Sequence, residues 1–118
     1  MASPPSAPEA AGVLPLAAAR AALAAAAGAT YVELLRHGTL SVELYAPRGV
    51  DPQEPHSRDE LYVVASGSGE FVCGPRRQRF AAGDLIFVPA GMTHRFEHFS
   101  ADLAVWVAFY GPEGGERQ

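Results

Sequence analysis

The stretch GDLIFVPAGMTH at residues 83–94 decides the fold of this chain. Its first glycine makes a turn before the apolar run Leu85–Val88, which predicts a short buried strand. Pro89 ends that strand, and Gly91 can take a positive φ in the turn that follows. His94 then opens the next strand, where the chain re-enters the fold from a rim. The stretch therefore predicts strand, turn and strand, with one histidine at the point of re-entry.

On both sides of this stretch the sequence has the period of two that is typical of β-strands. Turn signals of glycine, proline and serine interrupt it every few residues, as at His37-Gly38, Gly67-Ser68-Gly69 and Gly74-Pro75. We expect eight strands, at Thr30–Arg36, Thr39–Ala46, Glu60–Ser66, Glu70–Cys73, Arg76–Phe80, Leu85–Val88, Thr93–Phe99 and Leu103–Tyr110. Eight short strands in 118 residues indicate an all-β sandwich or closed barrel.

The N-terminal residues 1–29 are expected to form a loose arm and one short helix. Alanine, the best helix former, dominates Leu16–Ala27, and Gly28 stands where a helix would end. Because its apolar stripe is poor, we expect this helix to pack weakly on a sheet or on a neighbouring subunit. A single barrel domain, residues 30–111, follows, and residues 112–118 are predicted to be a flexible tail.

Composition excludes several classes of protein. The chain is 48% apolar with a formal net charge of -4, and all nine basic residues are arginines. This balance gives no footprint for nucleic acid, and the one basic cluster, Arg76, Arg77 and Arg79, is predicted to be a solvated hairpin. The alanine-rich stretch is too short to cross a membrane. Cys73 is the only cysteine and is expected to be a small buried side chain. With no visible secretory signal, we expect a cytoplasmic protein.

Two regions far apart in sequence carry candidate metal ligands. Glu54 and His56 are two residues apart, so on extended backbone their side chains point the same way. Glu60 opens the next strand with the same parity, and His94 begins a later strand. A barrel can bring these strands side by side. Imidazoles and carboxylates together form a mixed nitrogen and oxygen site suited to Zn, Fe, Mn, Ni or Cu.

These residues resemble the two motifs of the cupin family. The first motif ends in two histidines one residue apart, then three or four residues, a glutamate, six residues and a glycine. This chain has His56, Glu60 and Gly67 at that spacing. The second motif is a glycine, five residues, a proline, one residue, a glycine, two residues, a histidine, three residues and usually an asparagine. This chain has Gly83, Pro89, Gly91, His94 and then His98. The resemblance covers about residues 40–110.

The resemblance implies a double-stranded β-helix, the jelly-roll barrel of cupins, with His56, Glu60 and His94 as ligands of a divalent transition metal. Glu54 replaces the first histidine of the motif. It can bind the metal as a fourth ligand or face water in its proline-rich loop. Gln53 is a weaker candidate because its parity is wrong.

His98 replaces the usual asparagine and shares parity with His94, so we expect it to point inward. It is either a hydrogen-bonded structural histidine or a proton carrier. Tyr62, on the face of Glu60, either donates a hydrogen bond to a bound ligand or forms part of the wall. Arg58 is expected to form a surface salt bridge, or less readily to approach a ligand carboxylate.

Three aromatic residues are predicted to be core, or else an apolar lining of the cavity: Phe96, Trp106 and Phe109.

Three kinds of function fit this interpretation. The first is a metal-dependent enzyme acting on a small organic molecule, as an oxygenase, isomerase or lyase. The second is a non-catalytic cupin that holds a small metabolite or a metal, and the third is a metal-free structural barrel. Fold alone does not choose among them. The resemblance also implies a homodimer, for which the apolar strands Leu40–Ala46 and Leu103–Tyr110 are candidate edges.

Overall fold

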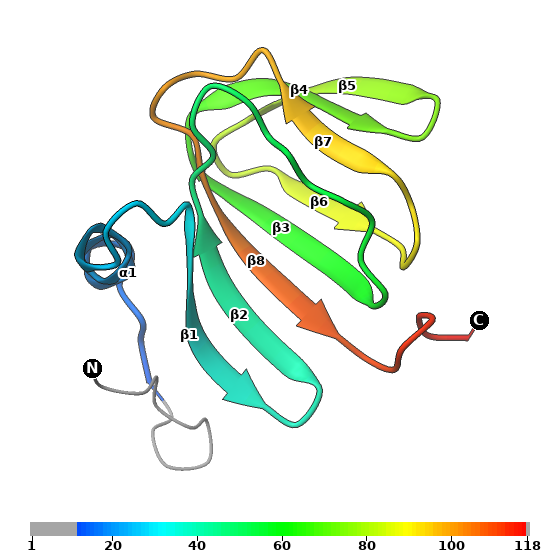
Figure 1. The fold of residues 1–118 in the computed structure, drawn as a ribbon, viewed down its shortest axis with the longest axis horizontal. Helices are drawn as coiled ribbons and strands as arrows, with labels where there is room; N and C mark the ends of the chain where they lie inside the picture. The colour runs from blue at the N-terminus through cyan, green and yellow to red at the C-terminus, as the bar shows by residue number, and fades with distance from the viewer. Residues whose placement is uncertain (1–11, 118) are drawn as a thin grey trace.

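Two β-sheets face each other and one helix lies outside them in the computed structural model, which describes residues 12–117 (Figure 1). The elements are α1 (Leu16–Ala25), β1 (Tyr31–His37), β2 (Leu40–Tyr45), β3 (Asp59–Ser66), β4 (Ser68–Cys73), β5 (Arg76–Ala81), β6 (Leu85–Val88), β7 (His94–Glu97) and β8 (Ala104–Tyr110). The all-β fold with one N-terminal helix is therefore confirmed, and every predicted bound lies within two residues of the observed one.

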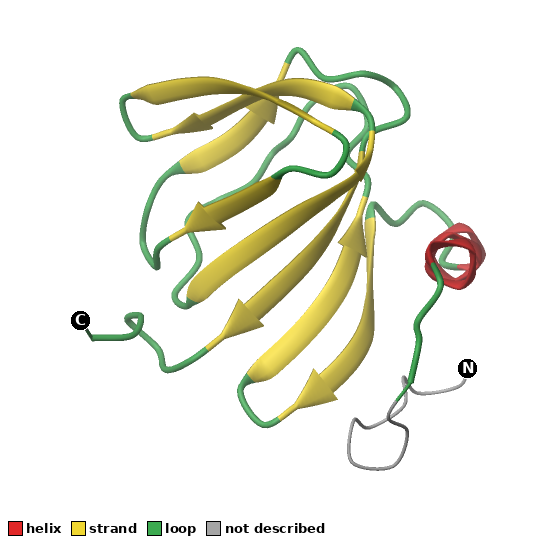
Figure 2. Ribbon diagram, turned by 180° about the vertical axis from the view of Figure 1, so that it is seen from behind, coloured by secondary structure: helices red, strands yellow, loops and turns green. Residues whose placement is uncertain are grey.

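The larger sheet has five strands in the order β1-β2-β8-β3-β6, and the smaller has three in the order β5-β4-β7 (Figures 1 and 2). Every pairing is antiparallel. The main core lies between the sheets, because alternate residues of each strand point inward. On β8 the inward residues are Val105 and Val107, which pack with Tyr62, Phe71 and Phe96 from the other strands.

Helix α1 covers the outer face of the larger sheet, over β1 and β2 (Figure 2). Ala19 packs there with Leu34, Leu44 and Ala104 in a second, smaller cluster. The sequence predicts that this helix packs on a sheet or on a neighbouring subunit, and the structure shows it on the larger sheet of the same chain. Trp106 belongs to this cluster and not to the barrel interior, since its parity on β8 is that of Ala104.

The chain crosses from the larger sheet to the smaller at a single glycine, Gly67, which separates β3 from β4. The predicted three-residue turn is wrong in length, because Ser68 already belongs to β4. Gly67 has a φ of 89°, and a Cβ added there would lie 2.7 Å from the Cα of Leu103. Only glycine satisfies both the left-handed backbone and this close approach.

An irregular segment, residues 46–58, runs beside β7 and is held there by polar bonds. The Asp51 carboxylate accepts a 2.8 Å hydrogen bond from the Phe96 N–H. It also accepts a hydrogen bond from the hydroxyl of Tyr45. The His56 carbonyl accepts a 2.7 Å hydrogen bond from the Gly91 N–H. These bonds fix the backbone of His56 against the turn that precedes His94.

The edge strands of the larger sheet are β1 and β6, so the expectation that Leu40–Ala46 and Leu103–Tyr110 offer free edges is wrong: both strands are interior. Homodimer formation itself stays a prediction.

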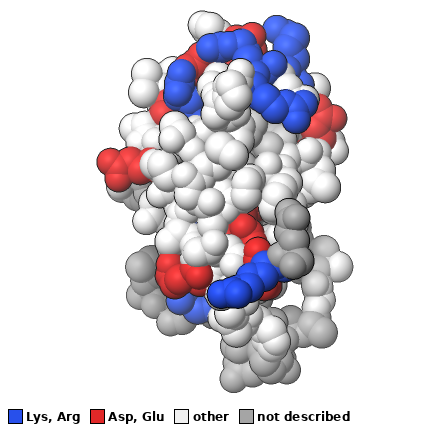
Figure 3. Space-filling model, turned by 90° about the vertical axis from the view of Figure 1, so that its right-hand side faces the viewer, with Lys and Arg blue, Asp and Glu red and all other residues white. Residues whose placement is uncertain are grey.

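Arginine side chains gather at the end of the molecule where β4 and β5 form their hairpin (Figure 3). Cys73 is partly exposed and not buried as expected. Among residues 12–117, no helix has the length and apolar character needed to cross a membrane.

Replacing Gly67 with alanine is expected to destabilise the fold by about 2–4 kcal/mol, since it adds a backbone clash to an unfavourable φ. The matched control is Gly83→Ala, where φ is 94° but the added Cβ meets nothing within 4 Å. That variant is expected to lose only about 1 kcal/mol. The free energy of unfolding in urea measures both. Equal losses would show that the approach to Leu103 does not constrain the crossing.

Candidate metal centre

Three side chains from separate elements converge inside the barrel. His56 comes from the irregular segment, Glu60 from β3 and His94 from the first position of β7. One ligand atom of each lies within 4.8 Å of the others. The Nε2 atom of His94 is 3.2 Å from Oε1 of Glu60, and Nε2 of His56 is 3.8 Å from the same oxygen. The structure therefore brings together all three residues that the motif spacing singled out.

The hydrogen bonding of His94 leaves two buried acceptor atoms in this cluster without a hydrogen-bond donor. Its Nδ1 lies 2.8 Å from the carbonyl oxygen of Met92, which can only accept, so Nδ1 carries a proton. In a neutral imidazole the other nitrogen, Nε2, then presents a lone pair. It faces the carboxylate oxygen of Glu60, which also presents lone pairs. Both atoms are buried and neither has a hydrogen-bond partner.

Either a proton or a metal ion can relieve the repulsion between the lone pairs of His94 and Glu60. Burial lowers the pKa of His94, but the Glu60 carboxylate and the Met92 carbonyl outweigh it, and the net pKa is raised. A proton shared between His94 and Glu60 leaves out the third donor, His56. A cation that accepts lone pairs from two imidazoles and one carboxylate satisfies all three. The residues present therefore fit a divalent transition metal.

The structure does not bring Glu54 to this cluster: the side chain is exposed, as in the water-facing alternative. Its neighbour Gln53 lies beside the cluster. Oε1 of Gln53 accepts a 2.9 Å hydrogen bond from the Tyr62 hydroxyl and lies 3.3 Å from Nε2 of His56. The parity argument failed because residues 51–58 do not form a strand.

The inward orientation predicted for His98 is wrong. Its side chain is 77% exposed, and Nδ1 lies 2.5 Å from a carboxylate oxygen of Glu70. The cause is a φ of 48°, which ends the strand alternation directly after Glu97. Because its side chain points into solvent, His98 is not supported as a proton carrier for the cluster.

Tyr62 is fully buried, and burial raises the pKa of its hydroxyl, which stays protonated. Its ring centroid lies 6.2 Å from that of His94. The predicted salt bridge of Arg58 is absent from the described residues; its guanidinium donates to the Thr39 carbonyl. Phe96 is core, as predicted, and Phe109 packs its ring edge-on to His56 at 4.8 Å between centroids.

A cavity of about 350 Å³ opens directly on the cluster, with His56 and Glu60 in its wall. Glu43 of β2 also lines it, a residue that the sequence did not single out. Burial and the nearby carboxyls of Glu33 and Glu60 raise the pKa of Glu43 to about 7. One signal could have found it: Glu43 shares the inward parity of Tyr45 on its strand.

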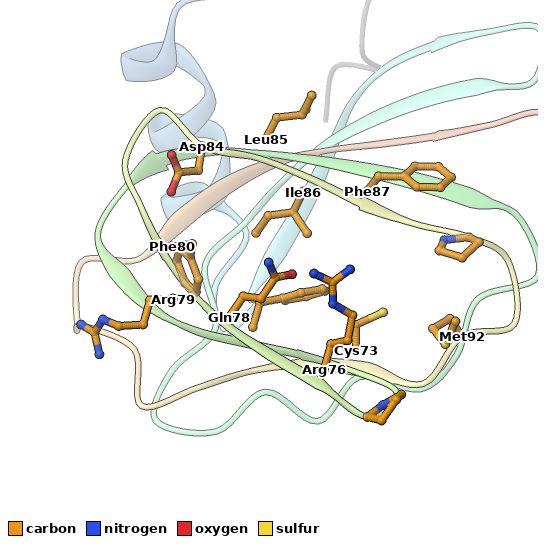
Figure 4. A pocket seen from close by; sticks show the side chains of 13 residues that line it. Cys73, Arg76, Gln78, Arg79, Phe80, Asp84, Leu85, Ile86, Phe87 and Met92 are labelled. Carbon is orange, nitrogen blue, oxygen red and sulfur yellow. The ribbon is translucent and has the colours of Figure 1, made fainter.

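A larger cavity of about 490 Å³ lies between β6 and the β4–β5 hairpin (Figure 4). Phe80 and Ile86 line it together with Cys73 and Arg76, and none of the three clustered residues reaches it. Chemistry is therefore more readily assigned to the smaller cavity.

A family model described as the cupin domain matches residues 41–110 of this chain. The match spans the strands β2 to β8 and both motifs, and the chain belongs to the cupin family.

The chain is also similar to a curated protein and to several solved structures. An uncharacterized protein of Streptomyces coelicolor is 42% identical over 91 residues, which cover 75% of this chain and 87% of that protein. The DMSP lyase DddQ from Ruegeria pomeroyi has a similar structure with a TM-score of 0.61 at 23% identity, over 69% of this chain and 46% of that one. KdgF from a Halomonas species is similar with a TM-score of 0.61 at 19% identity, over 70% and 78%. At these identities the solved structures share the fold alone with this chain.

Asp59, the buried neighbour of Glu60, connects three segments near the site by hydrogen bonds. Its carboxylate accepts hydrogen bonds from the N–H groups of Ala90, at 2.9 Å, and Glu116, at 2.8 Å. These bonds tie the turn before His94 and the described part of the C-terminal tail to β3. They also hold the pKa of Asp59 below its ordinary value of 3.8.

Because the folded-state pKa of Asp59 is lowered, its stabilisation is present above the unfolded value and is lost as the pH falls through the folded value. Asp59→Asn is therefore expected to lower the urea midpoint at pH 7, and the deficit should shrink below pH of about 4. The exposed Asp102→Asn serves as control and should change little at either pH. A deficit for Asp59→Asn that is the same at pH 7 and pH 3 would contradict this account.

Proposed function

We propose that this cupin is a metal-dependent enzyme acting on a small organic molecule, with His56, Glu60 and His94 as the protein ligands of a divalent transition metal. One observation carries the proposal: the Nε2 of His94 and the Oε1 of Glu60 face each other at 3.2 Å, buried and without hydrogen-bond partners. Two imidazoles and one carboxylate are a donor set that zinc and non-haem iron both accept, with positions left open for a substrate.

The bound metal would supply a Lewis acid that polarises a carbonyl or carboxylate oxygen of the substrate. The protein orients the ligands around it: the Met92 carbonyl fixes the ring of His94, and Tyr62 holds Gln53 beside His56. Such outer contacts set the tautomer and direction of metal-binding histidines.

Proton transfer requires a titratable group within reach of the bound substrate, and we assign this role to Glu43 in place of His98. Glu43 lines the cavity that His56 and Glu60 share, and a raised pKa near 7 suits a group that both accepts and releases protons. A titratable carboxyl in the cavity favours an isomerase or lyase over non-catalytic binding, which needs no such group.

Zinc titrated into chelator-treated protein is expected to bind with a stoichiometry of about one, because residues 12–117 contain one set of convergent ligands. Glu60→Gln removes the carboxylate while keeping the shape of the side chain, and His94→Ala removes an imidazole. Each is expected to weaken zinc binding by about 100-fold or more. Calorimetric titration, supported by elemental analysis, measures both.

The matched control is Glu54→Gln, the same substitution on an exposed side chain outside the cluster. It should bind zinc like the wild type. Circular dichroism checks that every variant is folded. Equal weakening by Glu54→Gln and Glu60→Gln, or wild-type protein that takes up no metal, would refute the assignment.

A further inference from the structure

Polar groups of two kinds line the cavity beside the cluster, and β8 separates the strands that carry Glu43 and Glu60. His56 and Glu60 belong to the candidate metal centre. On another part of the wall stands Glu43, carried by β2. Aromatic side chains line the cavity as well, including Tyr31 and Phe109, and Phe109 lies edge-on to His56. A molecule that fills about 350 Å³ would contact the metal centre, an aromatic surface and the Glu43 carboxyl together.

Among the described residues, this lining contains carboxyl groups but no arginine. The arginines of neighbouring segments are engaged elsewhere. Arg36 pairs with a glutamate of its own strand, and Arg48 and Arg58 donate to backbone carbonyls. Proteins often recognise a substrate carboxylate or phosphate with paired guanidinium donors, and the described lining of this cavity offers none.

The Glu43 carboxyl has no basic side chain within ion-pairing distance in the part of the chain that the structure describes. It is partly buried, and burial together with two acidic neighbours destabilises its charge. A ligand group that donates hydrogen bonds, or that is positively charged, would relieve this, whereas a second anion would add to it.

Building on the proposed function, we propose that the substrate is a small molecule with two polar ends. One end is an oxygen donor for the metal centre at His56 and Glu60. The other end is a hydroxyl or ammonium group that binds the Glu43 carboxyl and exchanges its proton with it, and an apolar or flat part between them contacts Phe109. Molecules whose distal end is a carboxylate or phosphate are disfavoured at this site.

Three probes with the same metal-binding group test this assignment: benzohydroxamic acids that carry a para-aminomethyl, a para-hydroxymethyl or a para-carboxylate group. Each is titrated calorimetrically into zinc-loaded protein at pH 8, where Glu43 is mostly ionised. Wild-type protein is expected to bind the aminomethyl and hydroxymethyl probes about tenfold or more tightly than the carboxylate probe. In Glu43→Gln the aminomethyl and carboxylate probes should come within about threefold of each other.

Glu113→Gln, which removes an exposed carboxylate outside the cavity, is the control and should keep the wild-type preference. The inference is overturned if the carboxylate probe binds as well as the others, if Glu43→Gln leaves the preference unchanged, or if zinc-loaded protein binds none of the probes. Failure of the proposed function itself is seen separately, as absent zinc uptake before any probe is added.

Discussion

The candidate site is defined by two lone pairs that face each other in the interior of the fold, on Nε2 of His94 and Oε1 of Glu60, 3.2 Å apart. Burying unpaired polar atoms costs free energy, so such a pair persists where a proton or a metal ion offsets the cost and the surrounding structure holds the two atoms in place. The surroundings here are strong: His94 is held by a backbone carbonyl, and Glu60 lies on a strand paired on both sides. Among residues 12–117, the buried side-chain atoms without a hydrogen-bond partner are these two, which is typical of a functional site.

The convergence is possible because the two sheets hold different members of the cluster. Glu60 lies in the larger sheet and His94 in the smaller one. Gly67 lets the chain cross from the larger sheet to the smaller one. The carboxylates of Asp51 and Asp59 accept hydrogen bonds from the backbone N–H groups of Phe96 and Ala90, which joins segments that are not paired as strands. The polar contacts that shape the barrel therefore also set the distances within the cluster.

Much of this was predictable from sequence because the signals were local. A period of two and frequent turn residues marked the eight strands, and motif spacing marked His56, Glu60 and His94. Parity failed wherever the backbone left the extended conformation. The left-handed φ of His98 turned its side chain outward, and the irregular segment placed Gln53 beside the cluster and Glu54 in solvent.

Two features needed the folded chain. Strand order is a long-range property, so the sequence could not reveal that β2 and β8 lie inside the larger sheet. Glu43 was missed because a single acidic residue in an apolar strand looks like a solvent-facing position. Its parity with Tyr45 is visible in the sequence, but its place beside Glu60 appears only when β2 lies across β8 from β3 and the two carboxyls share one cavity.

Anomalous X-ray diffraction from crystals grown with zinc or cobalt tests the central claim most directly, because it locates the metal without reference to any reaction. The account predicts one strong anomalous peak about 2.0–2.2 Å from Nε2 of His94 and from a carboxylate oxygen of Glu60, with His56 as the third protein ligand. A structure with no peak among these three residues, in which His94 and Glu60 share a proton, would contradict it.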